Sequence, residues 1–275
     1  MIDSKQKILI ITGMLLFVFV AINGSAATKD LVQQIKQKVE EIKKKPSIVF
    51  LITKDSNNYE AHNTVPLFAE MLEKEHGYKV TVLLGEGDHG SYRYPGMEAL
   101  SEADLLVVFA RRIALPHEQM NAIKEYLSKG KPLIGIRTAN HAFTVNGKVE
   151  DGFEDWPAFV ADILGCQNRG YGPVEPGTDV SVVPEAASHP IVKNLQTKQW
   201  HCKGNVYLVA PLLDKEANVL LEGKVNDKTE PIAWTRSAGN SKVFYTSLGH
   251  PTDFKVPQFI TLLTSGIKWC LEENL

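Results

Sequence analysis

Two histidines follow short apolar runs at distant points of the chain. The first stretch reads KPLIGIRTANHAF over residues 131–143, and the second reads VFYTSLGHPTD over residues 243–253. Each pattern is typical of a buried strand that ends in a turn, and the turns carry His141 and His250. Ligands of open α/β sheets bind in the crevice outside the carboxyl ends of the strands. We therefore expect the two histidines to face one pocket.

Histidine changes charge near neutral pH, so His141 and His250 suit proton transfer at a carbinol or an acidic carbon. Arg137, four residues before the first histidine, could hold a developing oxyanion with a fixed positive charge. Asp253 either orients a ring nitrogen of His250, accepts a sugar hydroxyl, or caps the following segment. The sequence thus predicts acid–base chemistry, with His141, His250, Arg137 and Asp253 as candidate catalytic residues.

Further polar and aromatic side chains follow the other apolar runs. A polyhydroxylated ligand needs many hydrogen-bonding groups and an aromatic surface against its apolar face. Arg111 and Arg112 are also alternatives for the oxyanion role. The residues expected to contact substrate are Tyr59, His62, Arg111, Arg112, Asn140 and Phe143.

A metal site is the competing arrangement, because three imidazoles and a carboxylate suit zinc or another transition metal. The sequence contains no H-x-x-x-H or C-x-x-C spacing, so no cofactor is required and a divalent metal stays an alternative. The ligands would come from His62, His141, His250, Asp55, Glu60 and Asp88.

The order of apolar runs predicts an α/β fold with a mainly parallel sheet flanked by helices and additional β-strands in the C-terminal half. Strands are expected at 48–53, 79–84, 105–109, 132–136, 179–183, 218–222, 232–235 and 243–247. Helices are expected at 64–76, 117–129 and 259–273.

The first residues differ from the rest. Two lysines precede an apolar run from residue 8 to 22, and small residues follow up to Ala27. This pattern predicts a signal peptide over 1–27, or an N-terminal anchor if it is not cleaved. A leader helix over 28–45 and a single domain over 46–275 would follow. We therefore expect an exported protein that is periplasmic or extracellular and touches a membrane only through an uncleaved N-terminus.

Composition excludes some partners. The net charge of −2 over 275 residues gives no reason to expect nucleic acid as a partner. The three cysteines, Cys166, Cys202 and Cys270, cannot all pair within one chain, and their spacing fits no zinc pattern. None of them is assigned a catalytic role.

Four blocks from residue 130 onward carry a family resemblance. They are GKPLIGIRTANHAF at 130–143, His-Pro-Ile at 189–191, EPIAWTR at 230–236 and KVFYTSLGHPTDF at 242–254. In this order they resemble the ThuA-like (trehalose utilisation) family of the class I glutamine amidotransferase-like superfamily, from residue 46 onward. The resemblance implies a flavodoxin-like sheet. Many relatives carry histidines where this chain reads GCQNRGYG over 165–172, and this difference weakens any metal site carried over to that segment.

The resemblance also implies what the chain lacks. Glutamine amidotransferases carry a nucleophilic cysteine on the turn after the fourth strand and a histidine in a His-Pro-Glu motif. Residues 135–139 contain no cysteine here, and the sequence after His250 is Pro-Thr-Asp. Without a thiolate no thioester forms, so glutaminase activity is excluded.

ThuA-like proteins are linked with the catabolism of trehalose and related disaccharides through 3-keto sugars. The resemblance therefore implies a carbohydrate ligand, a sugar dehydrogenase as partner, and elimination, hydration or isomerisation of a keto glycoside. Two alternatives stay open, a non-catalytic carbohydrate-binding or accessory module and a metal-dependent glycoside hydrolase. A conventional hydrolase needs two paired carboxylates, and no motif pairs them here.

Overall fold

The computed structural model describes residue 33 and residues 45–273. The chain divides into two compact units, residues 1–45 and 46–275, and the fold below is that of the second unit. The predicted signal peptide and nearly all of the predicted leader helix lie outside the described residues. No described helix is both long and apolar enough to cross a membrane.

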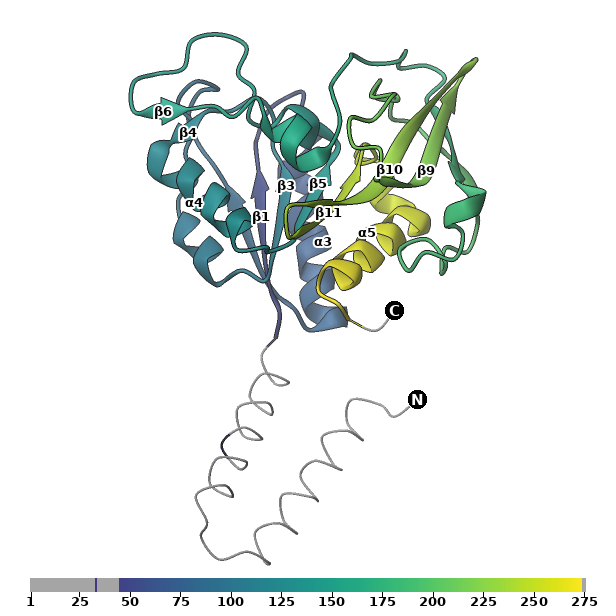
Figure 1. Ribbon diagram of the computed structural model, residues 1–275, viewed down its shortest axis with the longest axis horizontal. Coiled ribbons are helices and arrows are strands. Elements are labelled where there is room, and N and C mark those ends of the chain that lie inside the picture. Colours follow the sequence, from purple (N-terminus) through teal and green to yellow (C-terminus); the bar gives the residue numbers. More distant parts are fainter. Residues whose placement is uncertain (1–32, 34–44, 274–275) are drawn as a thin grey trace, which may run out of the picture. The chain divides into compact units, whose positions relative to one another are not determined.

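The second unit is built on a nine-stranded mixed sheet with the strand order β2-β1-β3-β5-β11-β10-β9-β7-β8. Figure 1 labels the central part of this sheet, from β1 to β9. The five strands from β2 to β11 are parallel, and β10, β9, β7 and β8 continue the sheet in antiparallel fashion. The strands are β1 (Ser47–Ile52), β2 (Lys79–Leu84), β3 (Leu105–Phe109), β5 (Leu133–Ile136), β7 (Thr178–Val182), β8 (Gln199–Cys202), β9 (Asn218–Val225), β10 (Lys228–Ala238) and β11 (Ser241–Thr246). A separate pair joins β4 (Leu115–Pro116) to β6 (Phe153–Glu154).

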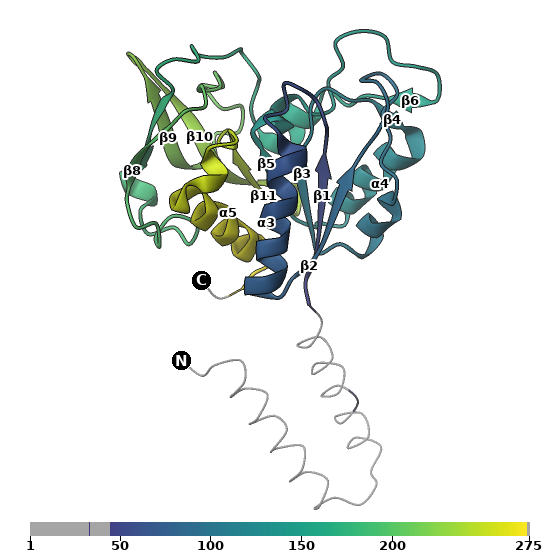
Figure 2. The ribbon, with the colours of Figure 1, turned by 180° about the vertical axis from the view of Figure 1, so that it is seen from behind.

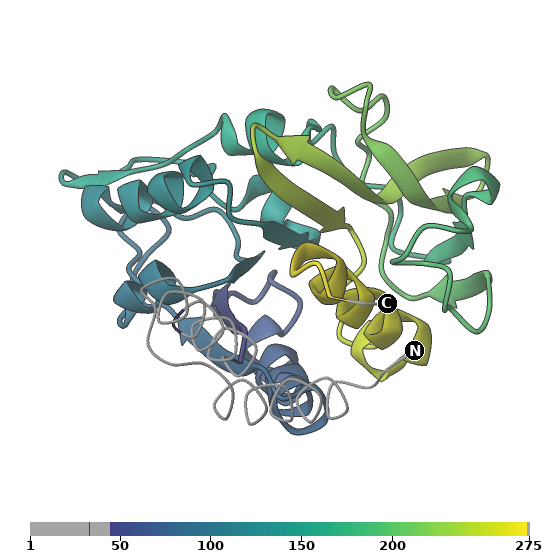
Figure 3. The same cartoon turned by 60° about the horizontal axis from the view of Figure 1, so that its bottom comes forward.

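Helices cover both faces of the parallel half. Alternate residues of β1 belong to different cores: Phe50 packs in the cluster that includes Leu72 and Leu263, whereas Leu51 packs in the cluster that includes Ile123. Figures 2 and 3 accordingly show α3 (Ala61–His76) and α5 (Pro257–Cys270) on one face and α4 (His117–Ser128) on the other. This arrangement follows from the period of two in a strand, which sends successive side chains to opposite faces.

The predicted fold class is confirmed, including the additional β-strands in the C-terminal half, which continue the same sheet. Sequence reasoning missed β8, whose Gln-Trp-His-Cys has no long apolar run, and the two-residue strands β4 and β6. It also ended β10 early, because that strand extends to Ala238 through an exposed hairpin with β11. Edge and hairpin strands are half solvated, so their hydrophobic pattern is weaker than that of the buried strands.

Candidate functional site

The turns after β1, β3 and β5 contain strained backbone. Six described residues other than glycine have positive φ, and four of them lie in these turns: Tyr59, Glu60, Arg112 and Arg137. Such conformations cost free energy, and they gather at sites where geometry is functionally constrained. The carboxyl edge of the parallel sheet is therefore the candidate site.

Arg137 occupies the turn after β5, where the glutamine amidotransferase pattern has its cysteine. Its side chain is fully buried and forms no ion pair within the described part of the chain. Nη1 donates to the Ser247 carbonyl at 2.6 Å, Nη2 donates to Asn205 Oδ1 at 2.8 Å, and Nε has no partner among described groups. The guanidinium carbon lies 3.9 Å from the centre of the Tyr59 ring and 4.8 Å from that of Tyr207. Arg137 is thus a buried cation held by carbonyls, an amide and aromatic faces.

His250 lies in the turn after β11. Its ring centre is 6.2 Å from that of Tyr59, and Nδ1 accepts hydrogen bonds from the Thr252 hydroxyl at 2.8 Å and the Thr252 amide at 3.3 Å. Burial lowers the pKa of His250, while Asp253 opposes the shift and Arg137 adds to it. The ring is therefore neutral at pH 7, with its proton on Nε2.

Asp253 is buried and organises the same turn. Its Oδ2 accepts hydrogen bonds from the backbone amides of Gly249 and His250, each at 2.9 Å. This geometry favours the capping interpretation over a direct role in chemistry.

His141 ends the short 3-10 helix η2 (Arg137–His141) and is 4% exposed. Its Nδ1 forms a hydrogen bond with Asn140 Oδ1, and Asn168 Nδ2 lies 3.2 Å from the same nitrogen. Because a carbonyl oxygen only accepts, Nδ1 carries the proton and Nε2 keeps its lone pair. Burial, together with Arg112, Arg111 and Arg137, lowers the pKa of His141 to about 3. The His141 ring is therefore neutral at physiological pH.

His141 lies in the wall of a pocket of about 500 Å³. This size lies within the range of small-molecule sites. The lining contains no carboxylate, and two of its members, Tyr171 and Leu213, are 44% and 48% exposed. The lining residues are Arg112, Asn140, His141, Thr144, Pro157, Val160, Ala161, Cys166, Gln167, Asn168, Gly170, Tyr171 and Leu213.

The pocket contains one of the two histidines. His250 and Asp253 are not among its lining residues, and no contact joins the two imidazoles in the described structure. Each ring instead contacts a different tyrosine: His250 lies by Tyr59, and the His141 ring centre is 6.1 Å from that of Tyr207. The expectation that both histidines face one pocket is not met, because the turn after β11 is anchored toward Tyr59.

The residues expected to contact substrate are dispersed. Arg112 and Asn140 line the pocket, whereas Phe143 is fully buried and packs edge-on against Phe159 at 5.0 Å. Phe143 is therefore part of the core rather than a stacking surface. Arg111 is bound to Asp55 at 3.1 Å.

Tyr59 lies beside Arg137, and His62 lies on the first turn of α3. Neither residue lines the pocket. His62 Nδ1 is buried and has no hydrogen-bond partner among the described residues. The side chains that sequence reasoning did not assign to the site are Tyr207, Asn205, Asn168 and Gln167. The last two belong to the 165–172 segment, whose unusual composition was the available signal.

The alternative metal site is not assembled. Within the described ranges, no three His, Cys, Asp or Glu side chains converge as metal ligands do. The Asp55 carboxylate is paired with Arg111, and His89 Nε2 lies 3.1 Å from Asp55 Oδ2. All three cysteines are free and buried, and burial raises the pKa of the pocket-lining Cys166 to about 12. This thiol is protonated at neutral pH and is not a nucleophile.

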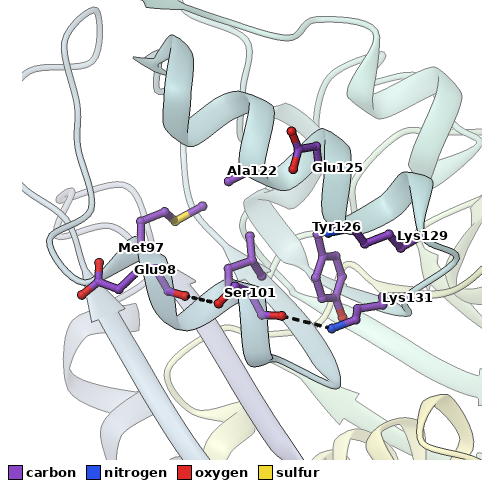
Figure 4. Close-up of a pocket in the computed structure, with 9 residues that line it drawn as sticks. Met97, Glu98, Ser101, Ala122, Glu125, Tyr126, Lys129 and Lys131 are labelled. Carbon is purple, nitrogen blue, oxygen red and sulfur yellow. Dashed lines mark hydrogen bonds between the residues drawn. The ribbon is translucent and has the colours of Figure 1, made fainter.

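A smaller hollow of about 120 Å³ lies between α4 and the 3-10 helix η1 (Met97–Glu102) (Figure 4). It is at the amino-terminal ends of β3 and β5, away from the turns described above. Lys131 Nζ donates to the Ala103 carbonyl at 2.7 Å and lies 5.5 Å above the Tyr126 ring. Lys131 is engaged by the backbone carbonyls of Ser101 and Ala103, and we do not assign the hollow a ligand.

Comparison with known families shows to which family this chain belongs. The ThuA family model, described as trehalose utilisation, matches residues 48–270. This chain belongs to the ThuA family. The predicted resemblance is confirmed, and membership of the ThuA family connects the protein with carbohydrate utilisation. No curated protein matches the chain.

Solved structures show the same ThuA fold. A ThuA-like protein of Bacteroides uniformis is 21% identical with a TM-score of 0.60, over 82% of this chain and 92% of that chain. One from Parabacteroides merdae is 18% identical with a TM-score of 0.61, over 82% and 90%. At this identity the likeness concerns the fold alone.

Proposed function

We propose that this ThuA-family protein is an exported enzyme of carbohydrate catabolism that acts on oxidised (3-keto) glycosides, with His141 as the general base. The observation that carries the proposal is the place of His141 in the wall of a pocket that no carboxylate lines. Asn140 holds the proton on Nδ1, so Nε2 keeps its lone pair, and burial together with three arginines keeps the ring neutral. Export rests on the pattern of residues 1–27.

The proposed reaction depends on the acidity of the C–H bonds next to a ketone. A C–H bond next to the carbonyl is acidic, and His141 Nε2 would take that proton while the electron pair forms an enolate. The enolate then expels the glycosidic oxygen from the carbon beyond, and the departing oxygen takes the proton that His141 Nε2 has accepted, which returns the imidazole to its neutral form. The negative charge of the enolate is favoured in this pocket, because Arg112 lines it and no carboxylate does.

The lining also weighs against one alternative. Hydrolases that cleave unmodified glycosides use two carboxylates on either side of the bond. The pocket beside His141 has none. A base that removes a carbon-bound proton does not need that pair.

The test is a time course by NMR with trehalose and its 3-keto derivative. We expect consumption of the keto sugar only, and we expect His141→Gln to lower kcat by roughly 100- to 10,000-fold, as for loss of a general base. His201→Gln is the matched control, because His201 is half exposed, pairs with Asp179 and lies outside the pocket. Thermal unfolding of both variants checks that they are folded.

Unchanged turnover by the His141→Gln variant would refute the proposed base. Binding of the sugar without turnover would favour the non-catalytic module. A parallel series with EDTA tests the metal-dependent alternative, which predicts loss of activity on chelation.

A further inference from the structure

The charge of the pocket points to a narrower ligand class. Sites for neutral sugars commonly offer carboxylates to accept hydroxyl protons, but this lining contains an arginine and no Asp or Glu. The cation is Arg112, which has no ion-pair partner in the described part of the chain. Its Nη1 donates to Asn146 Oδ1 at 2.8 Å and to the Thr144 carbonyl at 3.5 Å, both uncharged acceptors.

Arg112 is also fixed in place. Its backbone has a φ of 51°, and its amide donates to the His141 carbonyl at 3.1 Å. The side chain is held through Nη1, and within the described residues Nε and Nη2 donate no hydrogen bond. A planar fork with free donors matches the two oxygens of a carboxylate.

A second donor lacks a partner at the same wall. Asn140 is completely buried and lines the pocket, and its Nδ2 has no acceptor among described groups. Buried amide hydrogens are nearly always satisfied, so an orphan at a pocket indicates a group supplied by the ligand or by water. The neighbouring Asn168 Nδ2 donates to the Tyr171 hydroxyl at 3.1 Å, so it is already engaged.

The charges around the pocket also favour an anionic group in the ligand. Arg111 is neutralised by Asp55 and Arg137 does not line the pocket, so Arg112 is the cation that the lining presents. The two exposed apolar members of the lining, Tyr171 and Leu213, offer a surface for the face of a sugar ring. The wall therefore combines an uncompensated cation with an apolar rim.

We propose that the pocket selects an acidic sugar, a glycoside that carries a carboxylate of the uronate or aldonate type, and that Arg112 binds this carboxylate. The proposal rests on the proposed function, since it names the substrate class of the same site. The carboxylate and the reacting carbonyl are different groups of one ligand, so binding and turnover are separable measurements.

The experiment is calorimetric titration of the full chain with methyl glucuronide and with methyl glucoside at fixed ionic strength. We expect the glucuronide to bind more tightly, and Arg112→Gln to weaken it roughly ten- to hundredfold while changing glucoside binding less than about twofold. Arg112→Lys should restore part of the affinity, because the charge returns without the fork. Lys148→Gln is the control, since it removes the same charge from an exposed residue outside the pocket that pairs with Glu150.

The outcomes separate the two proposals. Equal affinity for both sugars, or an Arg112→Gln variant that keeps its preference, overturns the acidic-sugar assignment and leaves the chemistry of His141 untouched. Inorganic phosphate that competes as well as the glucuronide overturns the carboxylate in favour of a general oxyanion site. Loss of turnover alone does not bear on this inference, because the inference is measured by the preference in binding between the two sugars.

Discussion

At the scale of single residues, His141 shows how neighbours set a protonation state. Burial disfavours the imidazolium form, and three guanidinium groups disfavour it further, so the pKa falls to about 3. In the unfolded chain the same ring titrates near 6.5. At mildly acidic pH, His141 therefore binds a proton in the unfolded state but not in the folded state.

The free energy of unfolding should therefore depend on pH through His141. The His141 contribution favours folding fully above pH 6.5 and is lost as the pH falls below that value, by at most about 1.4 kcal/mol per pH unit. We expect the urea midpoint to fall between pH 7 and pH 5 in the wild type, and to fall less in His141→Gln. An identical fall in both proteins would show that other groups cause it.

At the scale of elements, one buried amide joins the turns that carry the site. Asn58 Nδ2 donates to the Thr53 hydroxyl at 2.8 Å and to the Phe109 carbonyl at 2.8 Å, and Asn58 Oδ1 accepts from the Thr138 hydroxyl. Thr53 and Phe109 are at the ends of β1 and β3, and Thr138 lies in η2 after β5. Asn58 thus fixes three strand ends against one another.

Asn58→Ala should destabilise the fold by about 2–3 kcal/mol, because it leaves several buried groups without partners. Asn57→Ala, at an exposed neighbour, is the control and should change stability by less than about 0.5 kcal/mol. Urea unfolding at pH 7 measures both. A loss of under 1 kcal/mol in Asn58→Ala would mean that water replaces the amide.

At the scale of the whole sheet, Arg137 connects the parallel and antiparallel halves. It belongs to the turn after β5, but it donates to Ser247 after β11 and to Asn205, which lies between β8 and β9. Gly204 permits this approach, since a Cβ there would lie 3.1 Å from Arg137 Nη1 and from His250 Cβ. The buried cation is therefore a structural crosslink, rather than the oxyanion contact that its place in the sequence favours.

Arg137→Met should lower the free energy of unfolding by about 3 kcal/mol, because the carbonyl and amide oxygens that now accept hydrogen bonds from the guanidinium would be left buried without donors. Lys224→Met, at an exposed position of β9, is the control and should be nearly neutral. Equal unfolding midpoints for the two variants would contradict the crosslink.

The sequence by itself determined the fold class and the absence of an amidotransferase nucleophile. The buried strands carry continuous apolar runs, and their order already predicts a parallel sheet with helices on both faces. The missing cysteine after β5 is a matter of residue type alone. Such features depend on local composition, so they can be read without tertiary structure.

Only the tertiary structure decided which polar residues share a pocket. His141 meets Asn168 and Tyr171 there, while His250 turns toward Tyr59 and Phe143 enters the core. Turn conformations with positive φ and contacts between distant segments set these directions. The reason is physical: strand order brings many loops to one edge of the sheet, but the packing of each loop against its neighbours determines where its side chains point.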